Sequence, residues 1–346
     1  MPRKSKEVME EEGTCGPGCS DDEETPRVKS ACKLDIAALV EAAKGRFDKK
    51  KGGISARMKT GDEIILSTNP DDYISSPEID LFWKPLTGLM GVAYGRIFQI
   101  AGQPDSGKST LAMQLMKAAQ DQGALVVLWD AEGKFDSRRF HDRMGGDPSQ
   151  IPVAPSRNIL EGVQQVVAYV RATKEMDPNQ KILVVWDSVG SSINSAEDEE
   201  NDDYSKQPGV TAKEVSWGIR RFNQLMEKYR DENGGYTIAI LAINQVYANI
   251  GFMKSGFKQK GGAELEYLSS LILEMSRKKT LTKIRNKQKI KYGIETVARV
   301  KKNHLFGGDD CVAEMDLVVS ASGIYLSSEI KKKTQDDEII EEEDEE

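Results

Sequence analysis

The chain has 346 residues, of which 38% are hydrophobic and 30% charged, enough for two domains or for one large α/β domain with appendages. It has no run of 18 apolar residues and no hydrophobic segment near its N-terminus, so we predict a cytoplasmic protein that is neither secreted nor membrane-spanning. The formal net charge of −8 is concentrated at the ends: residues 1–32 carry 8 acids and 5 bases, residues 334–346 carry 9 acids and no base, and residues 33–333 are left at +4.

Residues 1–32 form a low-complexity acidic segment, for which we predict disorder rather than a packed domain. Three of the four cysteines lie in it, at Cys15, Cys19 and Cys32, and neither of the two histidines is near them. A zinc site needs four ligands, usually as two spaced pairs. We therefore expect the reduced thiols of a cytoplasmic protein in this tail rather than a metal site.

Residues 33–51 place apolar side chains at helical spacing ahead of a basic end, which predicts an amphipathic helix stopped by the two glycines that follow. From residue 54 to residue 95, turn-forming dipeptides separate short apolar pieces, which predicts a linker and a β-rich approach to the core. We therefore predict a helix-and-linker segment at residues 33–85, a core at residues 86–327 and an acidic tail at residues 328–346.

Residues 102–110 fulfil the pattern G-x-x-x-x-G-K-[ST], between an apolar run and a helix-compatible segment, as a phosphate-binding loop requires. Its glycines let main-chain N–H groups turn toward a triphosphate, and the next helix points its positive dipole end at the same oxygens. We expect Lys108 on the β- and γ-phosphates and the Ser109 hydroxyl on Mg²⁺. The predicted nucleotide-binding residues are Gly102, Gln103, Pro104, Asp105, Ser106, Gly107, Lys108, Ser109 and Thr110.

Apolar β-like runs then alternate with helix-compatible segments, which is typical of a mostly parallel sheet covered by helices. Strands are expected at residues 96–101, 124–129, 181–186, 236–243 and 295–300. Helices are expected at residues 110–122, 137–144, 159–174 and 212–232. The predicted fold class is therefore α/β, with ligands at the carboxyl ends of the strands.

Three of these strand ends carry polar residues: Glu132 follows one strand, Asp187 the next and Gln245 a third. Phosphoryl transfer needs positioning, a metal ion and a group that aims the attacking water. We expect Asp187 to hold Mg²⁺ through water, Glu132 to polarise the attacking water, and Gln245 to sense the γ-phosphate. Asp or Asn alone often ends a strand as a turn former, but three such residues at three strand ends favour a site.

The combination of these motifs resembles the RecA recombinases. The phosphate loop is followed by DAE after one strand, by VVWDS in and after the next, and by INQ ahead of a glycine-rich loop that ends at Gly261 and Gly262. The likeness covers about residues 33–326, and the helix at residues 34–50 is similar to the segment through which RecA protomers polymerise. It implies a RecA-like P-loop ATPase core with a mostly parallel central sheet, preceded by an N-terminal polymerisation helix and a linker.

The resemblance implies that ATP and Mg²⁺ are the cofactors. It places the metal on Ser109 and Asp187. It implies a catalytic set of Lys108, Glu132, Gln245 and Lys302. Residues carried over in this way match the family's motifs at the same points of the chain, and each role is an expectation for this protein.

Two further parts of the nucleotide site follow from the resemblance. Asp136 would face the adenine, and the residue stacked on it is Arg139 or Phe140, depending on where a one-residue insertion is placed; we prefer Phe140. Three residues would reach across the subunit interface to the neighbour's γ-phosphate, in the manner of an arginine finger: Lys301, Lys302 and His304. His304 stands where the family has a second lysine, so we expect slower hydrolysis, because histidine is neutral at pH 7 unless its pKa is raised.

Two segments correspond to the family's DNA-binding loops, near residues 192–211 and 246–262. The first is strongly acidic over residues 192–208, which departs from what contact with a polyanion requires. The second is cationic with interleaved aromatics, and it suits sequence-tolerant single-strand binding because lysines neutralise phosphates and rings stack on bases. Its predicted DNA contacts are Tyr247, Phe252, Lys254, Phe257, Lys258, Lys260, Gly261 and Gly262.

Residues 277–291 hold eight bases and no acid, and the alternation over residues 283–292 predicts an exposed hairpin. Two interpretations stay open for this basic run: lysines that guard a strand edge, or a surface that attracts DNA. The acidic tail likewise has two interpretations, a disordered solvated tail or a competitor of a polyanion for the basic body.

We therefore predict a DNA-dependent ATPase that forms a helical filament on single-stranded DNA and catalyses homology search, pairing and strand exchange in recombination and repair. Expected partners are single-stranded and homologous double-stranded DNA, further copies of the chain, and single-strand-binding or mediator proteins. We expect no counterpart of the family's C-terminal domain after residue 325, and therefore a compact, phage-type recombinase in a bacterial nucleoid or phage-infected cytoplasm. The alternatives are a RecA-fold hexameric helicase or loader, and a nucleotide-gated single-strand-binding protein with little turnover.

Overall fold

The structure is a computed structural model that describes Ala38 and residues 69–198, 209–231, 234–248, 257–259, 262–285, 287–305 and 311–327. The chain divides into two compact units, Met1–Thr60 and Gly61–Glu346, and every described residue except Ala38 belongs to the second. Ala38 is helical, and the rest of the helix predicted at residues 33–51 lies outside the described residues.

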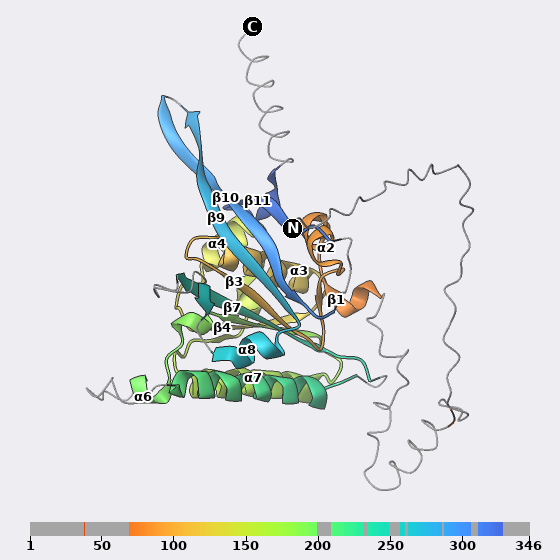
Figure 1. The fold of residues 1–346 in the computed structure, drawn as a ribbon. Helices are drawn as coiled ribbons and strands as arrows, with labels where there is room; N and C mark the ends of the chain where they lie inside the picture. The colour runs from red at the N-terminus through yellow and green to blue at the C-terminus, as the bar shows by residue number, and fades with distance from the viewer. Residues whose placement is uncertain are drawn as a thin grey trace, which may run out of the picture. The chain divides into compact units, whose positions relative to one another are not determined.

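The second unit is built on one large sheet (Figure 1). Its strands are β3 Ile97–Gly102, β4 Leu125–Asp130, β5 Val153–Ala154, β6 Ile182–Asp187, β7 Ile238–Ala248, β8 Phe257–Gln259, β9 Leu271–Arg285, β10 Gln288–Asn303, β11 Glu314–Ser320 and β12 Ile324–Leu326. The strand order is β12-β11-β10-β9-β3-β7-β6-β4-β5, with β8 paired to β7 off this path. From β9 to β5 all neighbours are parallel, whereas β10, β11 and β12 extend the sheet in antiparallel pairs.

Helices cover both faces of the sheet (Figure 1). One layer contains α2 Pro77–Thr87, α3 Lys108–Asp121 and α4 Ser137–Met144, and the other contains α5 Ile159–Met176, α7 Val210–Lys228 and α8 Gly262–Leu268. Alternate strand residues face opposite layers, so that Val126 packs in the first core cluster and Val127 in the second. Among the helices that the structure describes, none has the length and apolar character needed to cross a membrane.

The remaining elements are short. They are η3 Pro70–Asp72, η4 Pro148–Gln150, η5 Val189–Ser191, α6 Ser195–Asp198, and the paired strands β1 Tyr73–Ile74 and β2 Val92–Ala93. The strands and helices predicted for the core from its hydrophobic pattern are all present, and α4 has the predicted bounds. The prediction of an α/β fold with a mostly parallel sheet is confirmed.

The region before β3 differs from its prediction as a linker. Ser76 accepts a hydrogen bond from the Ile79 N–H, Pro77 occupies the first turn, and Gly88 ends the helix in the left-handed region at φ 70°. These turn-like residues are therefore the start and stop signals of α2. Phe82 and Trp83 of this helix are buried in the first core cluster. The predicted boundary between residues 85 and 86 thus falls inside α2, and the packed core begins further toward the N-terminus.

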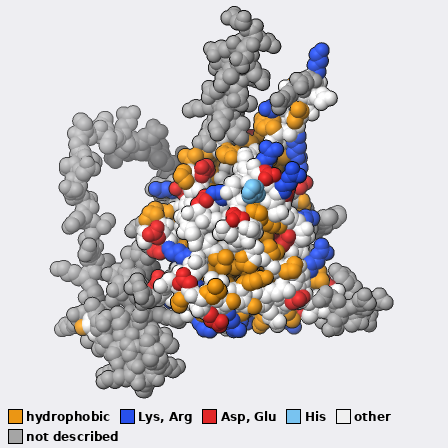
Figure 2. Space-filling view, turned by 180° about the vertical axis from the view of Figure 1, so that it is seen from behind, with side chains coloured by type: hydrophobic (Ala, Val, Ile, Leu, Met, Phe, Trp, Pro, Cys, Tyr) orange, Lys and Arg blue, Asp and Glu red, His pale blue; other side chains and the backbone are white. Residues whose placement is uncertain are grey.

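The hairpin predicted at residues 283–292 is confirmed and is longer than expected. Strands β9 and β10 pair from Asn303 with Leu271 out to Gln288 with Arg285. β11 pairs with β10 only from Gly293 to Arg299, so the outer part of the hairpin is a two-stranded arm that projects from the sheet (Figure 1). Figure 2 shows lysine and arginine side chains along this projecting arm.

Candidate active site at the strand ends

The phosphate-binding loop joins β3 to α3, and two neighbouring strands determine where glycine is needed in it. A Cβ on Gly102 would lie 2.1 Å from the Met275 carbonyl oxygen of β9. A Cβ on Gly107 would lie 2.6 Å from Val319 Cγ2 of β11, and its φ of 98° is in the left-handed region. No side chain caps the N-terminus of α3 in the described structure, so its first N–H groups are left for an anion.

Lys108, the first residue of α3, is buried within this loop with 7% of its surface exposed. Its Nζ donates a hydrogen bond of 2.6 Å to the Gln103 carbonyl oxygen, which curls the lysine over the loop. Burial lowers the pKa of Lys108, and the charges of Asp187 and Glu132 oppose that shift. A bound phosphate would further favour the charged amine, because opposite charges interact more strongly in a partly desolvated site.

Asp187 lies at the end of β6 and faces Ser109. Burial raises the pKa of Asp187 to about 6, and the hydrogen bond from the Ser109 side chain opposes this rise. Its Oδ1 is buried and has no hydrogen-bond partner among the described residues. A desolvated carboxylate oxygen beside a hydroxyl is a donor set that suits Mg²⁺. The residues present therefore fit the predicted metal site.

The Asp187→Asn variant is expected to be more stable than the parent in the absence of nucleotide and metal. Because the folded-state pKa is raised from 3.8 to about 6, the ionised carboxylate destabilises the fold increasingly as the pH rises through this window. Above this window the loss of folding free energy is about 3 kcal/mol, and it vanishes below the unfolded-state pKa of 3.8. Chemical unfolding at pH 4.5 and pH 8 measures the difference, and a variant that is less stable at pH 8 would contradict it.

Asp130 provides the matched control for this variant, because it also ends a strand but its carboxylate has several hydrogen-bond donors. Its carboxylate accepts hydrogen bonds from the backbone N–H groups of Gly133, Lys134 and Phe135. Asp130→Asn removes the charge and weakens these acceptors, so we expect it to lower stability at pH 8. The opposite signs of the two variants would separate a metal ligand from a structural carboxylate.

Glu132 is held by residues from the two adjoining strand ends. Gln245 Nε2 donates to Glu132 Oε1 at 2.9 Å, and Ser191 Oγ donates to the same oxygen at 3.1 Å. The Glu132 N–H in turn donates to the Asp187 carbonyl oxygen at 3.2 Å. The three predicted strand-end residues are therefore brought together. Ser191 was not predicted, because only the η5 turn carries it back toward Glu132 and no pattern in the sequence marks it.

The predicted adenine contacts differ in their outcome. Asp136 caps α4 by accepting a hydrogen bond from the Arg139 N–H at 2.8 Å. Phe140, the preferred stacking residue, is fully buried, and a Cβ on Gly146 would lie 2.2 Å from its ring, so it would have to move to contact an adenine. The other option, Arg139, lies beside the phosphate loop and donates to Thr110 Oγ1 at 3.0 Å.

Comparison with known proteins agrees with this geometry. The family described as "RecA N-terminal domain" matches residues 38–323. The chain belongs to the RecA family. It is 28% identical to Protein RecA of Ureaplasma parvum serovar 3 over 77% of this chain and 71% of that protein. It is also 28% identical to Protein RecA of Lactobacillus delbrueckii subsp. bulgaricus, over 89% and 85%, and to that of Roseiflexus sp., over 76% and 68%.

The residues that the RecA resemblance places in a neighbour's site lie at the opposite edge of the sheet. Asn303 pairs with Leu271, which lies beside Phe98 near the start of β3, whereas the phosphate loop begins where β3 ends. Here Lys302 Nζ donates to the carbonyl oxygens of Glu266 and Tyr267 at 2.6 and 2.7 Å, at the end of α8. Lys301 forms a 3.1 Å ion pair with Glu266, and the His304 side chain is exposed.

The two RecA-type loops begin in the described structure and continue outside it. In the first, the carboxylate of Glu214 on α7 accepts a hydrogen bond from the Ser195 N–H at 3.2 Å, joining α6 to α7. In the second, β7 and β8 pair from Val246 with Gln259, so the loop leaves the sheet as a hairpin. Tyr247, Phe257, Lys258 and Gly262 lie on described backbone, whereas Phe252, Lys254, Lys260 and Gly261 lie outside it.

Proposed function

We propose that this protein is an ATP-dependent recombinase that assembles on single-stranded DNA and exchanges strands between homologous molecules. The observation that carries the proposal is the 2.9 Å hydrogen bond between Gln245 and Glu132. Gln245 is followed directly by the hairpin whose sequence is cationic and aromatic, and Glu132 is the carboxylate proposed to act on ATP. One contact therefore links the proposed chemistry to the proposed polynucleotide site.

Different residues of the chain would bind the phosphates, hold the metal ion and orient the attacking water. The N-terminus of α3 and Lys108 would hold the β- and γ-phosphates. Asp187 and Ser109 would hold Mg²⁺, which when bound neutralises charge on the phosphate oxygens. Glu132 would accept a hydrogen bond from the attacking water and orient it in line with the phosphorus atom. Once its hydrogen bond to Glu132 is broken, Gln245 would turn toward the γ-phosphate and shift the strand that leads into the hairpin.

Assembly of several copies follows from the position of Lys301, Lys302 and His304. At the far edge of the sheet they cannot complete the nucleotide site of their own protomer, but a neighbouring copy could present them to it. Such a contact joins two different surfaces and repeats without needing to close, which gives a helical filament unless the rotation happens to close a ring. Completion of each site by the next copy would make assembly dependent on nucleotide.

Electron microscopy of the full chain with single-stranded DNA and a non-hydrolysable ATP analogue tests the proposal. We expect helical filaments that need both ligands, and strand exchange between homologous but not heterologous DNA. Closed rings with unwinding activity would favour the helicase alternative. Filaments without DNA-stimulated ATP turnover would favour the single-strand-binding alternative. A chain that stays monomeric with both ligands would overturn the proposal.

The projecting β9–β10 arm is the described surface best suited to a second DNA molecule. At its base, Lys278 pairs with Asp316 at 2.6 Å and Lys279 with Glu295 at 2.8 Å. Further out, the pairing places Lys289 across from Ile284 and Lys283 across from Ile290, so both faces of the ribbon carry a lysine. Such an arm would contact phosphates rather than bases, because lysine neutralises charge without reading sequence.

Replacing Lys283, Lys289 and Lys291 with Gln is expected to weaken duplex DNA binding while leaving single-strand-stimulated ATP turnover unchanged. If each lysine contacts one phosphate, the slope of log affinity against log salt concentration should fall by about 0.9 per lysine, or nearly 3 in total. The double variant Lys278→Gln, Lys279→Gln removes bases already held by carboxylates and should change the slope less. An unchanged slope in the triple variant would indicate that these lysines protect a strand edge from further pairing and do not contact DNA.

A further inference from the structure

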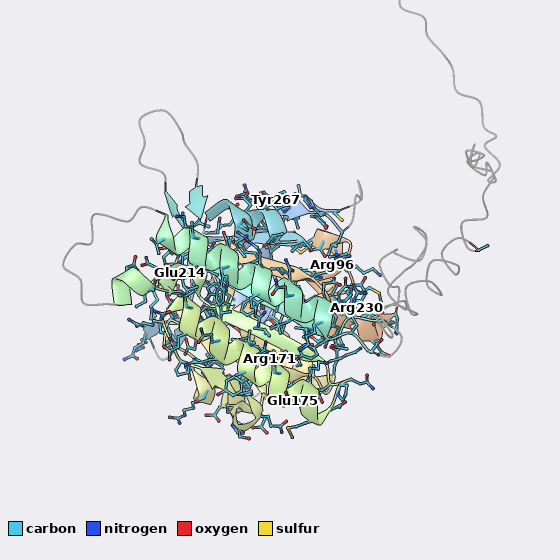
Figure 3. The ribbon with its side chains drawn as sticks, turned by 90° about the horizontal axis from the view of Figure 1, so that it is seen from below. Arg96, Arg171, Glu175, Glu214, Arg230 and Tyr267 are labelled. Atoms are coloured by element: carbon cyan, nitrogen blue, oxygen red, sulfur yellow. The ribbon has the colours of Figure 1, made fainter. Side chains whose placement is uncertain are left out.

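An open groove of about 540 Å³ runs between α5 and α7, on the helical layer seen in Figure 3. Apolar groups line its floor, among them Val167, Ala168 and Trp217. Trp217 has 41% of its surface exposed, whereas the other three tryptophans of the chain are buried. An exposed tryptophan in a groove is typical of a surface that anchors a partner.

The rim of this groove is positively charged. Arg171 of α5 and Arg220 and Arg221 of α7 line it, and no carboxylate of the residues that the structure describes does. Two carboxylates lie beside the rim: Glu264 of α8 pairs with Arg220 at 3.2 Å, and Glu175 lies one turn beyond Arg171 on α5 (Figure 3). Arg221 donates to Gln224 Oε1 at 3.0 Å, a neutral partner that leaves its charge in place. The groove therefore suits an acidic ligand with an apolar centre.

We propose that this groove binds the chain's own acidic C-terminal segment, residues 336–346. That segment reads DDEIIEEEDEE, in which Ile339 and Ile340 are the apolar residues and every other residue is a carboxylate. Its pattern is complementary to the groove: the isoleucines match the apolar floor and the flanking acids match the arginine rim. Arginine forms paired hydrogen bonds with carboxylates, which makes it the favoured base at such a rim.

Other acidic stretches of the chain fit the groove less well. Residues 196–203 read AEDEENDD and offer no large apolar side chain. Residues 7–12 read EVMEEE, but Arg3, Lys4 and Lys6 come directly before them and would be repelled by the arginine rim. Single exposed ion pairs contribute little each. Covalent attachment of the segment to the protein compensates for these weak ion pairs, because it raises the effective concentration of the segment at the groove. This holds whether the segment belongs to the same molecule or to a neighbouring copy in an assembly.

Trp217 allows the proposal to be tested in the full chain, because it is the one tryptophan a docked segment would cover. We expect acrylamide to quench tryptophan fluorescence less in the full chain than in a variant that stops after Gln335. A peptide of residues 334–346 should restore the protection to the shortened variant. Protection should be lost in about 1 M salt, where the Debye length falls to about 3 Å. Trp217→Phe should abolish the difference between the two lengths.

The double variant Arg171→Glu, Arg221→Glu should lose the protection, whereas Lys213→Glu, Lys228→Glu, which reverses two exposed bases of α7 outside the groove lining, should keep it. Circular dichroism checks that both variants are folded. A peptide with Ile339→Ser and Ile340→Ser should protect less than the parent peptide.

Equal quenching in the full and shortened chains overturns the proposal. So does protection that survives the arginine reversals, since the segment would then lie elsewhere. Binding of an unrelated acidic protein without any effect of truncation would assign the groove to that partner and likewise overturn the proposal.

Discussion

The Glu132→Gln variant is expected to hydrolyse ATP about 100-fold more slowly than the parent or slower still, since a positioned general base contributes at least that factor. The substitution preserves shape, and the glutamine can keep its carbonyl oxygen where Oε1 now accepts from Gln245 and Ser191. What it removes is the charge proposed to polarise the attacking water. Nucleotide binding should be nearly unchanged, because the proposed phosphate contacts are the loop and Lys108.

Steady-state turnover combined with equilibrium binding of a labelled ATP analogue checks this prediction. The expected signature is a fall in kcat with little change in Kd. Glu161→Gln, which neutralises an exposed carboxylate on α5, is a matched control and should leave both constants unchanged. A variant that turns over at the parental rate would show that Glu132 is not the catalytic carboxylate and would transfer that role to another residue of the strand ends.

A second readout comes from the electrostatics of the site. The charge of Glu132 helps to raise the pKa of Asp187. Neutralising Glu132 should therefore lower the pKa of Asp187 and make its ionised form available at a lower pH. The pH at which Mg²⁺-dependent nucleotide binding is half lost should move down in the variant, although turnover is slow at every pH.

The strand ends of the site were predictable because buried parallel strands appear in the sequence as short apolar runs. Once those runs are placed, Glu132, Asp187 and Gln245 must emerge at one edge of the sheet. The burial of Phe140 was also predictable. It is the buried residue of α4, a helix otherwise rich in charge, and such a residue must face the core. Counting from neighbouring motifs favours Phe140 as the adenine contact, whereas helix amphipathicity favours a core position for it.

Other features depended on contacts between distant segments. Arg139 is placed by carbonyl oxygens of Ser320 and Ala321, about half the chain away, and no local pattern reveals this. The sequence predicts a linker at α2 because Pro77 and Pro85 are turn formers. In the structure Pro77 lies in the first turn of the helix, where proline is a start signal, Pro85 lies inside the helix, and Gly88 ends it. Whether such residues interrupt or delimit a helix depends on the burial of the residues between them, here Phe82 and Trp83.

The Gln245→Ala variant is expected to separate ATP turnover from DNA binding. Gln245 ends the parallel part of β7 and precedes the pairing of Val246 with Gln259, so it connects Glu132 with the hairpin. Without its amide, Glu132 keeps the hydrogen bond from Ser191 and stays near its position. Basal turnover should therefore be within a few-fold of the parent, while the ratio of turnover with and without single-stranded DNA falls to about one, as loss of a coupling free energy requires.

Ser191→Ala is the matched control for this variant, because it removes a second donor to the same carboxylate oxygen while leaving the Gln245 amide and its 2.9 Å hydrogen bond to Glu132 in place. It should lower basal turnover modestly, by loosening Glu132, and keep the stimulation by DNA. The reverse pattern, with stimulation lost in Ser191→Ala and kept in Gln245→Ala, would move the coupling to the acidic segment that follows η5. In that case the cationic hairpin would bind DNA without changing ATP turnover. A contact can couple two ligands only if its free energy changes when each of them binds, and the Gln245–Glu132 contact would not meet this condition.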